Sequence, residues 1–346
     1  MKTNTRGFFI SWFQESVIKT YSVKAIACFF LLAFLFSCTN DPTLSRPEAE
    51  RSLKVLNSDL TNFLSGVSES EVSQAFGFVW GHASSPVPFK KEKHKVWPVD
   101  TVFSLLTHGG YYKWDSTRDI FFRSSFSDSV ILEFPSPANT DESMTLILSE
   151  FETEPHLSRP AFPVRMVMEM LREGEEIMKL VHEGELRDNL PYSINSELKA
   201  GILEVSFQLN TKRQSDRGKV TSSILVKAGP RTLAEGTITS EVKYALSSYY
   251  FETIAPELEV FDMGITGTLL YGDIDPTSED YASSFNENCE ISFYDRSVNG
   301  KVGVLQLDEV NGGEQFDYFI LFNDGSSSPV GEYLLVLDKL LNYKYQ

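Results

Sequence analysis

The sequence lacks the short motifs with which several common enzyme classes build their active sites. It contains neither the His-Glu-x-x-His pattern of zinc hydrolases nor the Gly-x-Ser-x-Gly turn that carries a serine nucleophile. Its five histidines are well separated, at His82, His94, His108, His156 and His182. A metal site could therefore form only from residues that are distant in the sequence. We expect a protein without enzymatic activity, and we expect no cofactor and no metal.

A hydrophobic run long enough to cross a membrane is also missing. The main apolar stretch, from Ala25 to Cys38, has fourteen residues, whereas a transmembrane helix needs about 20. It follows Lys24 and ends with the small Ser37 just before Cys38. A basic segment, a short apolar run and a small residue before the cleavage point are typical of an export signal. We therefore assign residues 1–37 to a signal peptide that is removed.

The end of this stretch, Leu35-Phe36-Ser37-Cys38, resembles the lipobox of bacterial lipoproteins. The resemblance implies that cleavage follows Ser37, that Cys38 receives a diacylglyceryl thioether, and that the new amino terminus is acylated, commonly with palmitate. Thr39, which stands where an Asp would favour the inner membrane, resembles outer-membrane sorting. The implied location is the cell envelope, with the chain lipid-anchored to the outer membrane and its periplasmic or surface exposure left open.

Cysteine is scarce, and each of the three cysteines has a separate fate. Cys28 leaves with the signal peptide and Cys38 is consumed by lipid, so that Cys289 remains alone. The mature chain then has no intramolecular disulfide, and its hydrophobic core must stabilise it. No His, Lys or Arg lies close to Cys289 in the sequence to lower its pKa, so we expect a buried, inert thiol.

Basic residues are the minority charge. The chain has 31 Lys and Arg against 48 Asp and Glu, for a net charge of −17. Removing residues 1–37 takes away four basic residues and one acidic residue, which leaves 27 against 47 and a net charge of −20. Such a surface repels phosphate backbones, so we exclude nucleic acid as a partner.

Helical spacing is confined to a few segments after a polar tether at residues 38–51. Leucines and a phenylalanine recur three and four apart between Pro47 and Ser65, which predicts an amphipathic helix that Gly66 ends. Ser68 and Glu71 form a capping-box pattern before a second, shorter helix. Apolar residues at three- and four-residue intervals between Val164 and Val181 predict a third helix, weakened by Gly174.

The rest of the chain alternates as strands do. Strand-length runs occur between Phe121 and Phe151, and residues 193–212 and 219–243 predict two hairpins. Asn-Gly turns in residues 289–341 predict a four-stranded antiparallel meander, whose last run could equally be a helix. We expect a mainly β (α+β) fold, either an antiparallel sandwich or a long curved sheet of hairpins with about three helices packed on it.

The domain organisation follows from these patterns. A helical and then mixed α+β part at residues 52–190 precedes an antiparallel β part at residues 191–346, and the two together form one continuous domain. Tyr112-Lys113-Trp114-Asp115 and Phe134-Pro135, together with the lipobox, resemble Bacteroidota lipoproteins of unknown function. That resemblance implies an envelope location and no particular activity.

Three local patterns are candidate sites. Trp80, Trp97 and Trp114 are candidates for a ligand-binding surface, because indole rings suit sugars and apolar ligands. Ser196 and Lys199 match Ser-x-x-Lys, but they lie in a predicted strand where they face opposite sides. The loop from Asp273 to Asp280 spaces its oxygens as a calcium loop does, yet lacks the required Gly, so we expect a solvated turn.

These features favour a membrane-anchored envelope lipoprotein that acts as a non-enzymatic binding or structural module. Its partners would be the membrane, through the lipid on Cys38, and an unidentified glycan, apolar ligand or envelope protein. The alternative is an envelope hydrolase or a lipid carrier whose site is assembled from separated strands.

Overall fold

The computed structural model describes residues 35–36, 42–82, 84–88, 103–156, 159–188, 190–245, 248–274, 280–310 and 315–333. Its helical elements are α3 (Arg46–Glu69), α4 (Glu71–Gly81), α5 (Leu105–His108), η1 (Tyr271–Asp273), α6 (Tyr281–Glu287) and α7 (Val330–Tyr333). Its strands are β1 (Leu35–Phe36), β2 (Gly110–Asp115), β3 (Ile120–Ser125), β4 (Val130–Pro135), β5 (Ser143–His156), β6 (Arg159–Arg172), β7 (Glu175–Arg187), β8 (Leu190–Ala200), β9 (Leu203–Gln214), β10 (Arg217–Ala228), β11 (Arg231–Ala245), β12 (Ser248–Val260), β13 (Met263–Thr266), β14 (Ser292–Asp295), β15 (Gly300–Val310), β16 (Gln315–Leu321) and β17 (Ser327–Pro329). The predicted mainly β class is confirmed.

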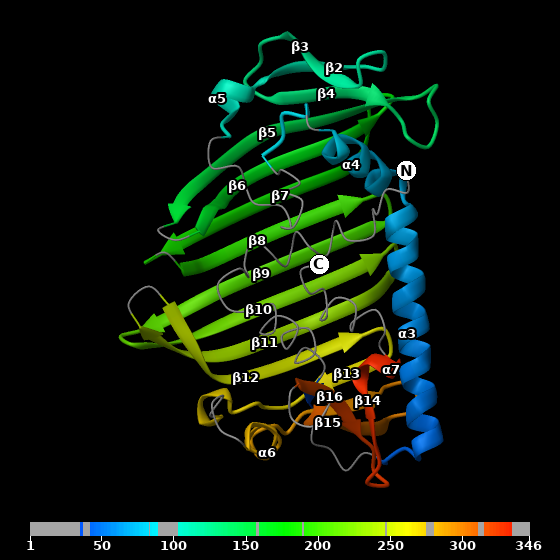
Figure 1. Ribbon diagram of the computed structural model, residues 1–346, viewed down its shortest axis with the longest axis vertical. Helices are drawn as coiled ribbons and strands as arrows, with labels where there is room; N and C mark the ends of the chain where they lie inside the picture. The colour runs from blue at the N-terminus through cyan, green and yellow to red at the C-terminus, as the bar shows by residue number, and fades with distance from the viewer. Residues whose placement is uncertain are drawn as a thin grey trace.

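The strands form one long mixed sheet (Figure 1). From β4 to β17 each strand pairs antiparallel with the next. The chain therefore adds strands in order, and a long connection that contains η1 and α6 lies only between β13 and β14. Two pairs are parallel, β2 with β4 and β1 with β13. Of the two predicted arrangements, the long sheet of hairpins is therefore the one that forms.

The two faces of the long strands differ in polarity. Residues paired across antiparallel strands point to the same face, so the register defines each face. One face is apolar and carries, among others, Leu146, Leu148, Met166, Met168, Met170, Met178, Leu180, Ile194, Leu198, Leu209, Val220, Ile238 and Val242, all of which are buried. The other face mixes charged residues with apolar ones such as Val167 and Val181, and there Lys179 Nζ lies 2.6 Å from Glu169 Oε1 on the neighbouring strand.

Helices cover the apolar face at both ends of the sheet. Helix α4 packs Phe76, Val79 and Trp80 into a core with strands β4 to β7. At the other end, α3 contributes Ala49, Leu53 and Leu56 to a second core with strands β11 to β16. Helix α3 runs lengthwise between these two ends, beside the ends of the long strands (Figure 1). In the part of the chain that the structure describes, no helix is both long and apolar enough to span a membrane.

The first two predicted helices are confirmed, but their junction lies elsewhere. Helix α3 continues through Gly66 to Glu69, so Gly66 does not end it. The break comes at Ser70, whose hydroxyl accepts the amide hydrogen of Ser73 and caps α4 in place of Ser68. Gly66 is exposed and can stay helical because glycine costs a helix only about 1 kcal/mol.

Replacing Gly66 by Ala is expected to stabilise the protein by about 0.5–1 kcal/mol. A Cβ at this position would meet nothing within 4 Å, so only the backbone preference changes. The measurement is the urea midpoint followed by circular dichroism at 222 nm. A lower midpoint for Gly66→Ala would contradict a helical role for this residue.

The third predicted helix, Val164 to Val181, is wrong. These residues form β6 and β7, joined by a two-residue turn in which Glu173 has φ 49° and Gly174 has φ 84°. Gly174 therefore serves a tight hairpin turn and does not interrupt a helix. The spacing resembles that of a helix because both faces of β6 carry apolar residues. Met166 and Met168 on one face are buried, and Val167 on the other face is half-buried. With apolar residues on both faces, strand alternation also produces three- and four-residue spacings.

The predicted hairpins are confirmed. Strands β8 and β9 flank Gly201, and β10 and β11 flank Gly229, both of which have φ 59°. Strands β14 to β16 form as the first three of the predicted C-terminal meander. The fourth strand is the short β17, which comes before the predicted last run at residues 332–341; the described start of that run, Glu332 and Tyr333, lies in α7. Asn311 to Gly313 and residues 334–341 of that prediction lie outside the described residues.

Candidate functional site

The start of helix α3 is fastened to the C-terminal strands. Thr43 forms an isolated parallel β-bridge with Lys301. In this bridge the Leu44 amide donates to Lys301 O at 2.9 Å, and the Lys301 amide donates to Pro42 O at 2.9 Å. Gly300 makes room for this contact, because a Cβ there would lie 2.3 Å from Leu44 Cδ2. The chain therefore enters α3 from a defined position on β15.

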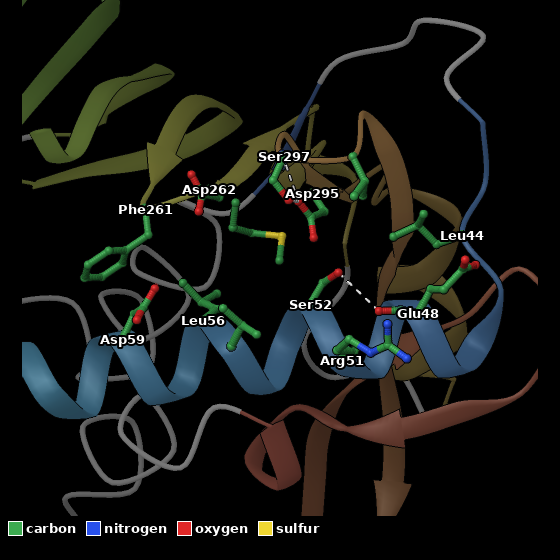
Figure 2. Close-up of a pocket in the computed structure, with 13 residues that line it drawn as sticks. Leu44, Glu48, Arg51, Ser52, Leu56, Asp59, Phe261, Asp262, Asp295 and Ser297 are labelled. Atoms are coloured by element: carbon green, nitrogen blue, oxygen red, sulfur yellow. Dashed lines mark hydrogen bonds between the residues drawn. The ribbon is translucent and has the colours of Figure 1, made fainter.

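A groove of about 280 Å³ opens beside this entry (Figure 2). One wall is a single face of α3. The other consists of the turn Phe261–Asp262 between β12 and β13, and of Asp295 at the end of β14 with Ser297 and Val298 just after it. The lining residues are Leu44, Glu48, Arg51, Ser52, Val55, Leu56, Asp59, Phe261, Asp262, Met263, Asp295, Ser297 and Val298. We call this site the α3 groove.

The α3 groove has an apolar floor and a charged rim. Leu56 and Met263 are 3% and 2% exposed and belong to the core beneath. Val55 and Val298 are 52% and 56% exposed, and they offer apolar surface on opposite walls. Four carboxylates, those of Glu48, Asp59, Asp262 and Asp295, line the site against one guanidinium, that of Arg51. The site therefore combines apolar contact area with a surplus of negative charge.

Two of the four carboxylates have hydrogen-bond partners that hold them in place. Glu48 Oε2 accepts from the amide and the hydroxyl of Ser45, at 2.9 and 2.5 Å. Those hydrogen bonds, the hydroxyl first, lower the pKa of Glu48, and the positive charge of Arg51 acts in the same direction. Asp295 Oδ1 accepts from the amide of Ser297 at 2.9 Å and from its hydroxyl at 2.6 Å.

The other two carboxylates, Asp59 and Asp262, make no ion pair within the described residues. Two arginines lie next to the groove without lining it. The guanidinium of Arg231 is 5.4 Å from the centre of the Phe261 ring, and Arg296 packs over Gly264. Asp262 is exposed and Asp59 is half-buried, so solvent reaches both of these carboxyl-bearing residues.

Phe261 adopts an unusual backbone conformation in the groove wall. Val260 pairs with Met263, so Phe261 and Asp262 form a two-residue hairpin turn, and Phe261 has φ 51°. This left-handed region favours Gly or Asn and is rare for a bulky side chain, at a cost of about 1–3 kcal/mol. The Phe261 amide donates to Leu233 O at 2.7 Å, which holds the turn in place. A bulky ring is thus kept at a position where glycine would be easier.

The predicted tryptophan surface is only partly placed by the structure. Trp80 on α4 is 5% exposed, and its ring lies 4.7 Å from that of Phe76. Trp114 on β2 is half-buried, 5.0 Å from the Phe78 ring and 4.3 Å from the His82 ring. Trp97 lies outside the described residues. A shared ligand surface for the three residues therefore stays a prediction.

The described part of the chain contains a buried serine and histidine pair that the sequence patterns did not reveal. His182 on β7 and Ser196 on β8 are each 2% exposed and face each other across the hairpin, with Nδ1 and Oγ 2.7 Å apart. His182 Nε2 lies 3.0 Å from Pro163 O, and since a carbonyl only accepts, Nε2 carries the hydrogen. Nδ1 therefore accepts the hydrogen of the Ser196 hydroxyl.

Burial defines the role of this pair. It lowers the pKa of His182, because the charged form loses its hydration, although the Pro163 carbonyl acts in the opposite direction. A nucleophilic serine needs a base and a path for substrate, and at 2% exposure Ser196 has no such path. The pair satisfies polar groups inside the sheet. Lys199 is exposed on the opposite face of β8, as predicted, so the Ser-x-x-Lys spacing has no geometric counterpart.

The remaining sequence predictions divide between described and undescribed residues. Cys289 is buried, as expected. Cys38, the predicted lipidation residue, and residues 275–279 of the acidic loop lie outside the described residues. Among the residues that are described, no three His, Cys, Asp or Glu side chains are grouped so as to hold a metal ion.

Comparisons with known proteins assign no family to this fold or to the α3 groove. No family model matches the chain, and neither the curated proteins nor the solved structures contain a match to it.

Sequence patterns predicted the helix that forms one wall of the groove, but neither the groove itself nor its opposing wall. The α3 residues that line it recur at three- and four-residue spacing, at positions 48, 51, 52, 55, 56 and 59. The two opposing turns come more than 200 residues later. One available signal was the Asn299-Gly300 turn, which indicates a hairpin end but not its neighbour.

Proposed function

We propose that this protein is a lipid-anchored lipoprotein of the outer membrane that acts as a non-enzymatic binding module, with the α3 groove as its binding site. The observation that carries the proposal is the closeness of the groove to the anchor along the chain. Leu44 lines the groove, and it follows Cys38 by six residues. Six extended residues reach at most about 20 Å, so a lipid on Cys38 keeps the groove close to the membrane surface.

The fastening of residues 42–44 supports the same proposal. Hydrogen bonds from Leu44 to Lys301, and from the Asn323 side-chain amide to Leu44 O at 3.3 Å, connect the tether directly to the groove-bearing end of the sheet. An anchor at Cys38 would therefore hold this end of the molecule toward the membrane. Several acyl chains at about 0.8 kcal/mol per buried methylene would make the attachment durable.

The test is to express the full chain in a bacterium with two membranes and to label it with radioactive palmitate. We expect the wild-type protein to carry label and to sediment with outer membranes, and Cys38→Ala to lose essentially all of the label. Cys28→Ala is the matched control, because that cysteine leaves with the signal peptide, and it should be labelled as the wild type is. Label retained on Cys38→Ala would refute the lipid anchor.

A further inference from the structure

The α3 groove has the size and chemistry of a site for amino-acid side chains. Pockets for whole small molecules usually enclose about 300–1,000 Å³, and the groove, at about 280 Å³, lies just below that range. Its apolar floor of Leu56 and Met263 suits an aliphatic group, and its rim is acidic. A ligand that fits both must carry apolar and cationic groups close together.

Other classes of cation or ligand fit the groove less well. A metal ion needs several ligand atoms that converge on one point, and the described residues include no group of three candidate ligands. Phosphate-bearing ligands would meet four carboxylates against one guanidinium. A small hydrophilic amine would leave Val55 and Val298 without contact, although both are half exposed on opposite walls.

From this complementarity we infer that the α3 groove binds a short cationic and aliphatic peptide segment of another envelope protein. A Lys or Arg of that segment would lie against Asp59 and Asp262, which have no ion-pair partner among the described residues. A neighbouring Leu or Val would cover the floor between Val55 and Val298. The inference deepens the proposed function and rests on it only for the location of the partner, at the same membrane surface.

The charge of the chain adds to the specificity of such a site. With a net charge of −17, the protein attracts cationic partners at long range and repels acidic ones. Attraction alone would be equally strong at any acidic patch, so the groove must differ from other acidic surface. The difference is its apolar surface, the floor together with Val55 and Val298, and the experiment must separate the charged from the apolar contribution.

The experiment measures binding of a fluorescein-labelled peptide, acetyl-Gly-Lys-Leu-Lys-Val-Gly-amide, to the purified full-length protein by fluorescence anisotropy. The double charge reversal Asp59→Lys with Asp262→Lys should weaken binding by at least about tenfold, because both counter-charges become repulsive. The matched control, Asp141→Lys with Glu175→Lys, changes the net charge by the same amount at exposed acidic residues far from the groove. It should weaken peptide binding by less than about threefold.

A second variant pair tests the apolar contribution. Val55→Ser with Val298→Ser leaves every charge in place and changes two half-exposed side chains, so the fold should be retained. We expect binding about three- to tenfold weaker, in line with the loss of apolar contact area. A peptide in which Leu and Val are replaced by Ser should lose affinity to a similar extent on the wild-type protein.

Each result decides the inference. Equal losses for the groove and control charge reversals would overturn it, because they would indicate non-specific attraction only. So would undiminished binding by the serine variants, which would leave a simple cation site. The assay needs no lipid, so it can fail while palmitate labelling succeeds, and the converse also holds. Displacement of the peptide by phosphatidylethanolamine vesicles alone would assign the groove to a lipid headgroup and overturn the peptide inference.

Discussion

Replacing Gly236 by Ala is expected to destabilise the protein by about 3–5 kcal/mol, since it combines backbone strain with overpacking. Gly236 lies within β11 with φ 145°, a region that residues with side chains rarely adopt. A Cβ at this position would lie 2.2 Å from Glu257 O and 2.6 Å from Leu258 Cα on β12. Both atoms belong to the backbone of a paired strand, so the new methyl group can be accommodated only by moving β12.

The control for Gly236→Ala is Gly229→Ala. Gly229 also has a positive φ, 59°, but lies in a turn where a Cβ would meet nothing within 4 Å. That variant should cost only about 1 kcal/mol, the left-handed penalty alone. The measurement is the urea midpoint by circular dichroism with the slope held constant. If the two variants lost equal stability, close packing of β11 against β12 would be disproved.

Replacing His182 by Ala is expected to cost about 2–4 kcal/mol at pH 7.5, because it removes a buried ring and leaves polar atoms unsatisfied. The hydroxyl of Ser196 and the carbonyl of Pro163 would both lose their hydrogen-bond partner inside the sheet. Ser196→Ala removes only one of the two bonds and should cost about 1–2 kcal/mol. The double variant should cost less than the sum of the two single variants, because they share one interaction.

The same residue gives stability a pH dependence with a definite sign. Burial lowers the pKa of His182 in the folded protein, while the unfolded chain has the ordinary value of about 6.5. Between these two values the unfolded state binds more protons, so wild-type stability should fall as pH drops below about 6.5. In His182→Ala this part of the fall should be missing, so urea midpoints of the two proteins should converge between pH 7.5 and 5.5.

Carboxylates affect the pH dependence of stability in a lower pH range, so they do not obscure the effect of His182. Hydrogen bonds lower the pKa values of Glu48, Glu173 and Asp324 in the folded protein. Their stabilisation is present above their unfolded pKa values, near 4, and is lost as pH falls further. Unchanged separation of the wild-type and His182→Ala midpoints down to pH 5.5 would argue against a neutral, buried histidine.

The hairpins were predictable because their determinants are local. Gly201 and Gly229 have φ 59° in turns between strands that alternate in polarity. The glycine and the alternation can each be recognised within a few residues of the sequence. Helix α4 was predictable for the same reason, since Phe76 and Val79 repeat at helical spacing. The hairpin of β6 and β7 was not, because Val167 and Leu171 on its second face are apolar as well. Where both faces carry apolar residues, local spacing does not distinguish a helix from a strand.

The candidate site was only half predictable. The α3 face of the groove follows from helical periodicity, but its partners Asp262 and Asp295 depend on where β13 and β14 lie relative to the helix. That position results from the pairing of residues 42–44 with β15, more than 250 residues away. Long-range pairing leaves no trace in either local sequence, so no short pattern could have indicated it.

The sequence by itself determined the properties that need no knowledge of neighbours: a large acidic surplus, a total of three cysteines, a lipobox-like stretch that ends at Cys38, and turns that favour antiparallel hairpins. Charge, composition and turn preference are properties of single residues or of short runs. Only the tertiary structure decided that His182 meets Ser196, that Gly236 lies against β12, and that two distant turns close a groove on α3. Strand register and helix docking bring these groups together, and both are set by burial across the whole sheet.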